Sequence, residues 1–305
     1  MNETILNIKS LNKSFGSRHV LKDVNLDIRK GRIIGLIGAN GAGKTTIMKS
    51  ILGITNFEGE ISIEGINVTE SRHQALKAVG ALIEYPGLYP FLSGREQLNL
   101  FATGIDAKTN VEEIISKLKM TPYANVKTKN YSLGMKQKLG VGLALLNKPD
   151  LVILDEPING LDPKAAKELR DYILEEKENG ITFLISSHIL SELQRIADDV
   201  IIIDHGEIIR YTTMADLLAS NKSFYKIKTT NDEFALQLLN KNDVSIQSES
   251  EIIIPITEQF PIGDILELFM HNKIKILNIK QQTGDLEESL LSVIDKDQVI
   301  TGGNK

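Results

Sequence analysis

The most chemically distinctive stretch of the sequence is a glycine-rich segment that contains one lysine and one threonine. It reads GANGAGKT, from Gly38 to Thr45, and follows the apolar run RIIGLIG. Glycines let the backbone curl so that its N–H groups face phosphate oxygens, and a lysine adds positive charge there. With a strand before it and a helix after it, the segment predicts a nucleotide phosphate site. The predicted ligands are Gly38, Ala39, Asn40, Gly41, Ala42, Gly43, Lys44, Thr45 and Thr46.

Two acidic residues end a second apolar run, LVILDEP. At the tip of a strand, we expect Asp155 to join Thr45 in holding Mg²⁺. Glu156 beside it is placed to orient or deprotonate a water aimed at the γ-phosphate. Taken alone, such a pair is more often a solvated turn or a helix cap. The glycine-rich segment upstream reverses that balance.

His188 follows a third apolar run, ITFLISS. A lone histidine is more often a structural residue, but the end of a strand would bring this imidazole to the same edge of the sheet as Glu156. We therefore expect His188 to contact the γ-phosphate.

A second small-residue turn, YSLGMKQKLG, poses a separate question. Ser132, Leu133 and Gly134 open an apolar helix, and the free backbone N–H groups of that helix would point at an anion. The segment has no phosphate-binding lysine loop of its own. We refer to Ser132–Met135 as the signature turn.

Alternating apolar runs and helical patterns indicate the fold that positions these residues. Nearly continuous apolar runs predict strands covered on both faces, and hence an α/β fold with a mostly parallel core sheet. The first strands predict an antiparallel flank, and a helical insertion over about 93–142 starts at a capping box formed by Ser93 and Glu96. The predicted strands are ILNIKS, VNLDI, RIIGLIG, GALIE, LVILD, ITFLISS and DVIIIDHGEIIR.

The pattern changes after residue 218. Residues 1–218 are therefore expected to form one domain, and residues 219–305 a small accessory α+β domain. In that domain the predictions include a strand over 243–248, a final helix over 286–294 and a polar tail over 301–305.

Composition narrows the classes of function. A net charge of −5 without a Lys/Arg-rich block argues against a nucleic-acid partner. Zero cysteines exclude disulfides and cysteine-ligated zinc, which fits the cytosol. The N-terminus MNETILNIKS is not typical of a signal peptide, and the apolar runs are too short to cross a bilayer. A role at a membrane would therefore require another chain.

In their order, the segments GANGAGKT, YSLGMKQKLG, LVILDEP, NGLDP and SSH closely resemble the motifs of the ATP-binding subunits of ABC transporters. The resemblance covers Ile5 to about Leu218, and it implies a P-loop ATPase domain that uses ATP and Mg²⁺. It also implies that Phe15 stacks on adenine and that His188 is the switch histidine. Phe15 by itself would be more typical of a core residue at a strand flank.

The resemblance also answers the question about the signature turn. In this family two copies stack head to tail, so Ser132, Gly134 and Met135 are expected to contact the nucleotide held by Lys44 of the other copy. Asp162, at the end of the loop that starts at Gly160, is expected to cross the same interface. The turn departs from the commonest family form at Leu133 and at Met135–Lys136.

Glu84 stands where most of the family carries glutamine. It resembles the glutamate of transporters that confer resistance or immunity to lantibiotics and bacitracin, which implies a catalytic and Mg²⁺-ligating role. A carboxylate binds Mg²⁺ more strongly than an amide does, yet it adds negative charge near the γ-phosphate. The alternative is a loop acid that faces water.

Together these features predict the ATP-hydrolysing subunit of an exporter. We expect it on the cytoplasmic face of the cell membrane, as a homodimer bound to a separate polytopic membrane subunit near Glu84 to Leu100. A peptide antibiotic is the predicted cargo, and export of another drug or a lipid stays open.

Two other classes compete with this prediction. DNA-acting members of the superfamily need a long coiled-coil insertion, but only 87 residues lie between Lys44 and Ser132, without sustained heptads. Ribosome-acting members carry two ATPase domains, whereas this chain has one. A nucleotide sensor without turnover is disfavoured by the intact Glu156 and His188.

Overall fold

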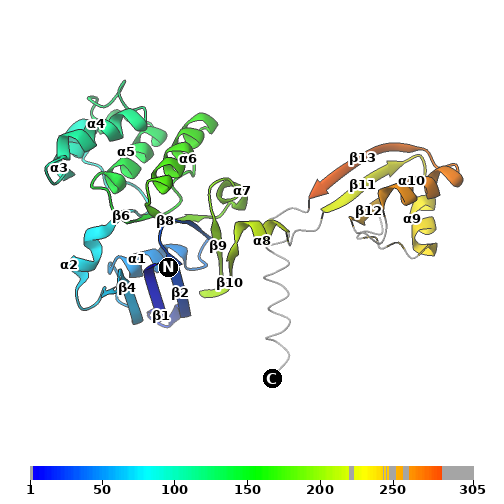
Figure 1. Cartoon of the computed structure of the whole chain (residues 1–305), viewed down its shortest axis with the longest axis horizontal. Coiled ribbons are helices and arrows are strands. Elements are labelled where there is room, and N and C mark those ends of the chain that lie inside the picture. The colour runs from blue at the N-terminus through cyan, green and yellow to red at the C-terminus, as the bar shows by residue number, and fades with distance from the viewer. Residues whose placement is uncertain are drawn as a thin grey trace. The chain divides into compact units, whose positions relative to one another are not determined.

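The computed structural model describes residues 3–219, 223–242, 244, 246, 252–256 and 261–283 (Figure 1). The chain divides into two compact units, Met1–Met214 and Ala215–Lys305. The dividing point lies at the start of α8 (Met214–Ala219), while the boundary expected from the sequence falls within this helix. Each unit is described by itself.

A six-stranded sheet forms the centre of the first unit, and its inner strands are buried along their whole length. All neighbouring strands are parallel except β9 and β10, which form an antiparallel hairpin. The predicted mostly parallel core is therefore confirmed. In spatial order the strands are β10 (Glu207–Thr213), β9 (Asp199–Asp204), β3 (Ile33–Ile37), β8 (Thr182–Ser187), β7 (Leu151–Leu154) and β6 (Val79–Leu82).

This strand order brings the chemistry-bearing segments together. β3 runs into the glycine-rich loop, β7 into Asp155 and Glu156, and β8 into His188. Because β3, β8 and β7 are parallel neighbours, their carboxyl ends meet at one edge of the sheet. Ligands of open α/β sheets bind at that edge.

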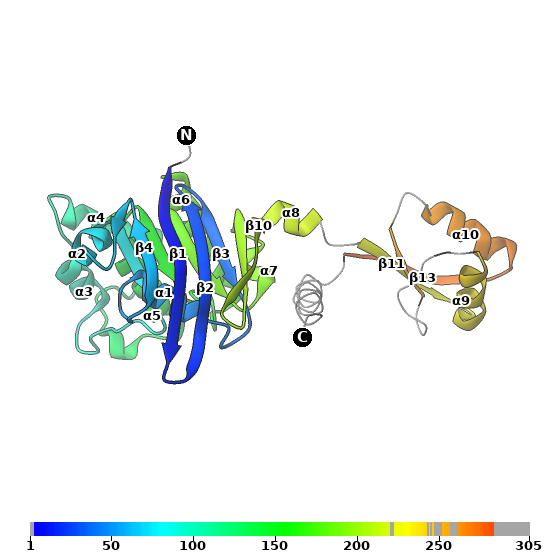
Figure 2. The same ribbon diagram turned by 90° about the horizontal axis from the view of Figure 1, so that it is seen from below.

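An antiparallel sheet flanks the core sheet, as the sequence predicts. Figure 2 shows β1, β2 and β4 side by side, in agreement with their pairing. Apolar residues of this sheet, of helix α1 and of the core sheet share one hydrophobic cluster. The strands are β2 (Arg18–Arg29), β1 (Thr4–Phe15), β4 (Glu58–Ile63) and β5 (Ile66–Asn67), and α1 spans Lys44–Ile51.

Between β6 and β7 the chain is helical, and Figure 1 shows α3, α4 and α5 gathered at one end of the unit. The capping box at Ser93 and Glu96 is present: each side chain accepts a backbone N–H of the other residue. The helices of this segment are α3 (Gly94–Phe101), α4 (Ala107–Lys117), the short 3₁₀ turn η2 (Thr128–Asn130) and α5 (Leu133–Leu145).

Further helices connect the strands of the first unit. They are α2 (Arg72–Ala75), the 3₁₀ turn η1 (Leu76–Ala78), α6 (Pro163–Glu178) and α7 (Leu190–Leu193).

The second unit has an α+β fold of its own. Helices α9 and α10 cover one face of an antiparallel three-stranded sheet, and Phe269 is fully buried in the cluster between them. In sheet order the strands are β12 (Ile252–Pro255), β11 (Ser223–Thr229) and β13 (Ile276–Thr283), with α9 at Asp232–Lys241 and α10 at Ile262–His271.

Some predictions need correction or lie outside the described residues. The run DVIIIDHGEIIR, predicted as one strand, is the β9–β10 hairpin, which turns at His205 and Gly206 with positive φ angles of 45° and 85°. The predicted strand over 243–248 lies largely outside the described residues. The predicted helix over 286–294 and the tail over 301–305 lie wholly outside them.

Candidate active site

The glycine-rich loop has the backbone geometry of an anion cradle. Gly41 and Gly43 have positive φ angles of 85° and 116°, which L side chains rarely adopt. A Cβ on Gly38 would lie 2.3 Å from the carbonyl oxygen of Ile203, so only glycine fits there. Gly43 is the N-cap of α1, and no side chain caps the helix. Backbone N–H groups of the first turn are therefore free of side-chain partners and available to a phosphate.

The side chain of Lys44, the first residue of α1, folds back onto the glycine-rich loop. Its ammonium group donates hydrogen bonds to the carbonyl oxygens of Gly38, at 2.6 Å, and Ala39, at 3.3 Å. It also lies 3.7 Å from Glu156 Oε1. The side chain is 7% exposed, so its charge acts where solvent screens it little.

Asp155 connects the loop to the core sheet. The Thr45 hydroxyl donates to Asp155 Oδ2 at 2.8 Å, and the hydroxyl of Ser186 donates to Asp155 Oδ1 at 2.5 Å. Both carboxylate oxygens are thus held by hydroxyl groups, and the residue is 4% exposed. This brings together the two predicted Mg²⁺ ligands from β7 and α1.

Glu156 adopts a left-handed backbone conformation, with φ of 49°. Its backbone N–H donates to Ser186 Oγ at 2.8 Å, and its carbonyl oxygen accepts a long 3.5 Å contact from Gln137 Nε2. Its carboxylate lies 2.8 Å from His188 Nδ1. The structure thus places the predicted base beside the predicted switch histidine.

A further glutamate near Glu156, Glu192, has a carboxyl group with a raised pKa. Burial raises the pKa of Glu192 on α7, and the negative charge of Glu156 raises it further. The Ser187 hydroxyl lies 3.5 Å from Glu192 Oε2.

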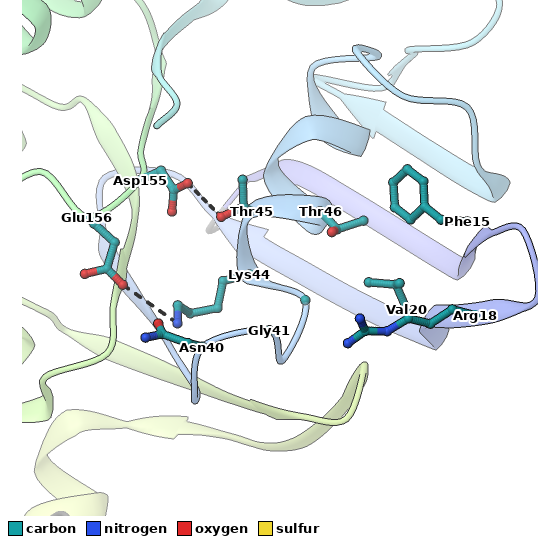
Figure 3. Close-up of a pocket in the computed structure, with 11 residues that line it drawn as sticks. Phe15, Arg18, Val20, Asn40, Gly41, Lys44, Thr45, Thr46, Asp155 and Glu156 are labelled. Carbon is teal, nitrogen blue, oxygen red and sulfur yellow. Dashed lines mark hydrogen bonds and ion pairs between the residues drawn. The ribbon is translucent and has the colours of Figure 1, made fainter. Parts of the chain in front are cut away.

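An open pocket of about 320 Å³ lies at this end of the sheet, and Figure 3 shows the side chains that line it. Lys44, Thr45, Asp155 and Glu156 form one end, and Phe15 lies at the other end beside Arg18. The nucleotide pocket is lined by Phe15, Arg18, Val20, Asn40, Gly41, Gly43, Lys44, Thr45, Thr46, Asp155 and Glu156. Its two chemically different ends suit a nucleotide, with phosphates at Lys44 and a base at Phe15.

Phe15 is 55% exposed, so it is not the core residue that its strand position alone would predict. Lys13 Nζ lies 4.6 Å from the ring centroid. An aromatic ring at the mouth of a polar pocket offers a stacking surface for a base.

The signature turn lies elsewhere. Among the described residues that line the nucleotide pocket, none belongs to this turn. Ser132, Gly134, Met135 and Asp162 instead line a separate depression of about 380 Å³, which we call the signature depression. The Ser132 hydroxyl accepts the backbone N–H of Met135 at 3.3 Å and caps α5. Asp162 caps α6 by accepting the N–H groups of Lys164 and Ala165.

Glu84 does not line the nucleotide pocket either. It lies just after β6, with φ of 59°, and its carboxylate is 2.5 Å from the ammonium group of Lys49 on α1. The Glu84 side chain is 60% exposed. The predicted contact of Glu84 with Mg²⁺ stays a prediction.

Three residues that contribute to this geometry were missed from the sequence. Arg18 follows the β1–β2 turn and lies in the pocket, Ser186 holds Asp155, and Gln137 reaches the carbonyl of Glu156. Ser186 and Gln137 were quoted within the motifs SSH and YSLGMKQKLG, so their motif membership was an available signal. Arg18 pairs with Phe15 across the two-residue turn Gly16–Ser17, and this local hairpin signal was also available.

The donor set fits Mg²⁺. Thr45 and Asp155 offer oxygen ligands, which this ion prefers, and it commonly completes its shell with water and substrate phosphates. Within the described residues, no group of three or more acidic, histidine or cysteine side chains forms a metal cage.

Comparison with known proteins places the chain in a family. The family model described as ABC transporter matches residues 21–159. The bacitracin transport ATP-binding protein BcrA of Enterococcus faecalis is 33% identical over 300 residues, 96% of this chain and 97% of that protein. The lantibiotic transport ATP-binding protein SrtF of Streptococcus pyogenes is 42% identical over 207 residues, 67% of this chain and 89% of SrtF.

A solved structure, described as the ATP-binding subunit of an ABC transporter, matches with a TM-score of 0.66 and 31% identity. The matched region covers 71% of this chain and 92% of the chain in the solved structure. Within the part of the chain that the structure describes, no helix is long and apolar enough to span a membrane. Since relatives match almost the whole chain and the phosphate loop is intact, this protein belongs to the ATP-binding subunits of ABC transporters, and it is an ATPase.

Proposed function

We propose that this ATPase drives export of a peptide antibiotic through a separate membrane subunit. The observation that carries the proposal is the full-length similarity to a bacitracin transport ATP-binding protein. The similarity to a lantibiotic transport ATP-binding protein supports the same class of cargo.

The residues of the nucleotide pocket have distinct roles in this proposal. Phe15 stacks on adenine, Lys44 binds the β and γ phosphates, and Thr45 with Asp155 would hold Mg²⁺. When bound, Mg²⁺ supplies charge neutralisation at the phosphates. Glu156 orients the attacking water and accepts its proton. The oxygen of that water bonds to the γ-phosphorus, the bond to the β-phosphate oxygen breaks, and ADP and inorganic phosphate leave.

A complete site requires a second copy of the chain. The signature turn and Asp162 gather at their own depression, away from Lys44. In a head-to-tail dimer, the N-terminus of α5 would complete the phosphate shell of the partner. His188 beside Glu156 would then sense the γ-phosphate.

Exposed aromatic side chains mark the surface proposed to meet the membrane subunit. Tyr85 and Phe91 are 83% and 65% exposed on the loop between β6 and α3. The Tyr89 ring stacks on Phe101 with centroids 6.3 Å apart. Neighbouring apolar side chains that stay exposed favour a protein partner. The loop starts at Glu84, whose carboxylate lies 2.5 Å from Lys49 on α1, the helix that also carries Lys44 and Thr45. Docking there, at the cytoplasmic face of the membrane, would be coupled to the nucleotide site through this pair.

The test is a deletion strain of the source organism challenged with bacitracin, with a lantibiotic and with a non-peptide drug. Loss of resistance to either peptide, restored by the wild-type chain and not by Lys44→Ala, is the expected result. In parallel, the tagged chain should co-purify with a polytopic membrane protein, and Phe91→Asp should weaken recovery. Unchanged peptide susceptibility with increased sensitivity to the non-peptide drug would assign a different cargo.

A further inference from the structure

A buried serine lies directly behind the two acidic residues of the nucleotide pocket. Ser186 is near the end of β8 and is 0% exposed. Its hydroxyl donates to Asp155 Oδ1 at 2.5 Å and accepts the backbone N–H of Glu156 at 2.8 Å. A single hydroxyl group therefore bridges the side chain of one acidic residue and the backbone of the next.

The bridge to Glu156 holds a backbone that is unfavourable by itself. A non-glycine residue with φ of 49° persists where its surroundings fix it. From this conformation the carboxylate reaches His188 Nδ1 at 2.8 Å and lies 3.7 Å from Lys44 Nζ. The direction of the proposed base thus depends on the backbone that Ser186 holds.

The bridge to Asp155 sets the rotation of a carboxylate. With Oδ1 occupied by Ser186, the other oxygen faces Thr45 and accepts its hydroxyl at 2.8 Å. Groups that orient a metal-binding carboxylate change metal affinity by about 10-fold to 100-fold when they are removed. Ser186 touches neither the nucleotide pocket nor solvent, so it acts through the two acids.

We propose that Ser186 is a positioning residue for ATP hydrolysis, which aims the Asp155 carboxylate at Thr45 and locks Glu156 in its left-handed conformation. The inference rests on the proposed roles of Asp155 and Glu156. It assigns to a strand residue a function that the two acids cannot supply by themselves.

The same strand provides a matched control. Thr182 lies four residues earlier on β8, is also 0% exposed, and its hydroxyl accepts the backbone N–H of Gly31 at 2.9 Å. Alternation of side chains along a strand places Thr182 and Ser186 on the same face of the sheet. Both hydroxyls accept a backbone N–H, but only the hydroxyl of Ser186 contacts the acidic pair.

The experiment compares Ser186→Ala, Ser186→Cys and Thr182→Val in the purified full-length chain. The cysteine variant keeps a small side chain of the same shape and replaces a strong hydrogen-bond donor by a weak one, in a protein with no other cysteine. For each variant we would measure the melting temperature, kcat and KM for ATP, and the Kd of a fluorescent ATP analogue in EDTA and in Mg²⁺.

Both Ser186 variants should lower kcat about tenfold or more and reduce the tightening of analogue binding by Mg²⁺, with the Kd in EDTA within about threefold of wild type. Thr182→Val should lower the melting temperature while kcat and the effect of Mg²⁺ stay at wild-type values. The inference is overturned if the folded Ser186→Cys protein keeps the wild-type kcat and Mg²⁺ effect. Glu156→Gln, assayed alongside, separates the two proposals: turnover in that variant would instead refute the role of Glu156.

Discussion

The two helices whose N-termini were expected to face a phosphate are built differently. Helix α1 starts at a left-handed glycine, has no side-chain cap, and begins with the buried cation Lys44. Helix α5 starts at Ser132, whose own hydroxyl accepts a backbone N–H of the first turn. The first N-terminus is prepared for a strong anion, whereas the second is already partly satisfied.

The charged side chains near the two helix N-termini also differ. In the nucleotide pocket, Lys44 lies between backbone carbonyls and Glu156. In the signature depression, Lys138 and Lys119 are both paired with Glu168, at 2.5 and 3.1 Å. Hydrogen bonding to Lys138 lowers the pKa of the Glu168 carboxyl, which keeps it charged. In the proposed function, the first region carries the catalytic charges, and the second would offer shape and N–H groups to a partner.

The largest expected effect follows from removal of the buried cation. Lys44→Ala should weaken ATP binding roughly 100-fold or more, or about 3 kcal/mol, because the phosphates lose their charge-assisted donor. Isothermal titration calorimetry measures this directly. Lys22→Ala, at an exposed pair with Glu207, is the control and should bind ATP like wild type. If Lys44→Ala bound ATP with wild-type affinity, the charge of Lys44 would not contribute to phosphate binding, and the proposed difference between the two regions would be wrong.

A change at Glu156 should abolish ATP hydrolysis without abolishing ATP binding. Glu156→Gln keeps the size and a hydrogen-bonding oxygen near His188, but it cannot accept a proton at neutral pH. We expect kcat to fall about 100-fold or more with ATP affinity retained, so that an ATP-bound dimer accumulates. Phosphate release and size-exclusion chromatography with ATP report the two effects. Hydrolysis at the wild-type rate would exclude Glu156 as the base.

The signature turn provides a test of the cross-subunit proposal. A Cβ at Gly134 would lie 3.5 Å from Leu161 Cδ2, an ordinary contact, so a side chain fits within one chain. Gly134→Asp should nevertheless place a carboxylate against the partner's γ-phosphate. In the Glu156→Gln background, the ATP-bound dimer should disappear while ATP binding at Lys44 persists.

Gly134→Asn is the matched control, since it has the same shape without the charge. It should weaken the dimer less than Gly134→Asp does. An intact dimer with the aspartate would show that the signature depression does not face the nucleotide of a second copy.

The core of this fold was predictable because its strands are continuously apolar and end in polar residues. The runs before Gly38, Asp155 and His188 could be placed at one sheet edge from sequence, and the structure has them there. The β9–β10 hairpin was missed because both strands are apolar, and the turn between them is only His205 and Gly206. Only the short stretch from Asp204 to Glu207 interrupts the apolar run.

Site residues were predictable from the sequence where the residue type itself indicates the chemistry, such as a lysine for phosphate or an aspartate for Mg²⁺. Lys44 and Asp155 belong to this class. Ser186 does not, because the motif SSH that contains it does not reveal its partners, which lie about 30 residues away just after another strand. The Glu84–Lys49 pair likewise joins segments that the sequence separates by 35 positions.

Glu84 should give the smallest effect on the ATPase itself. Its side chain is 60% exposed, and an exposed ion pair such as Glu84–Lys49 contributes about 0–1 kcal/mol. Lys44, Thr45 and Asp155 remain in place when Glu84 changes. We therefore expect Glu84→Gln and Glu84→Ala to bind ATP within about threefold of wild type, since little binding energy is removed. The measurement is ATPase rate with and without the membrane subunit, together with survival on a lantibiotic or bacitracin.

Glu84→Gln should change the stimulation by the membrane subunit, and Glu84→Ala should lose most of it, together with resistance. Lys49→Gln distinguishes the causes, because it breaks the same ion pair and keeps the carboxylate. If Glu84 acts through Mg²⁺ and the docking surface, Lys49→Gln should stay stimulated. If Lys49→Gln and Glu84→Ala fail alike, the ion pair itself links α1 to the loop. If Glu84→Ala matches wild type in both assays, Glu84 is a solvated loop acid, and the proposed coupling through it is refuted.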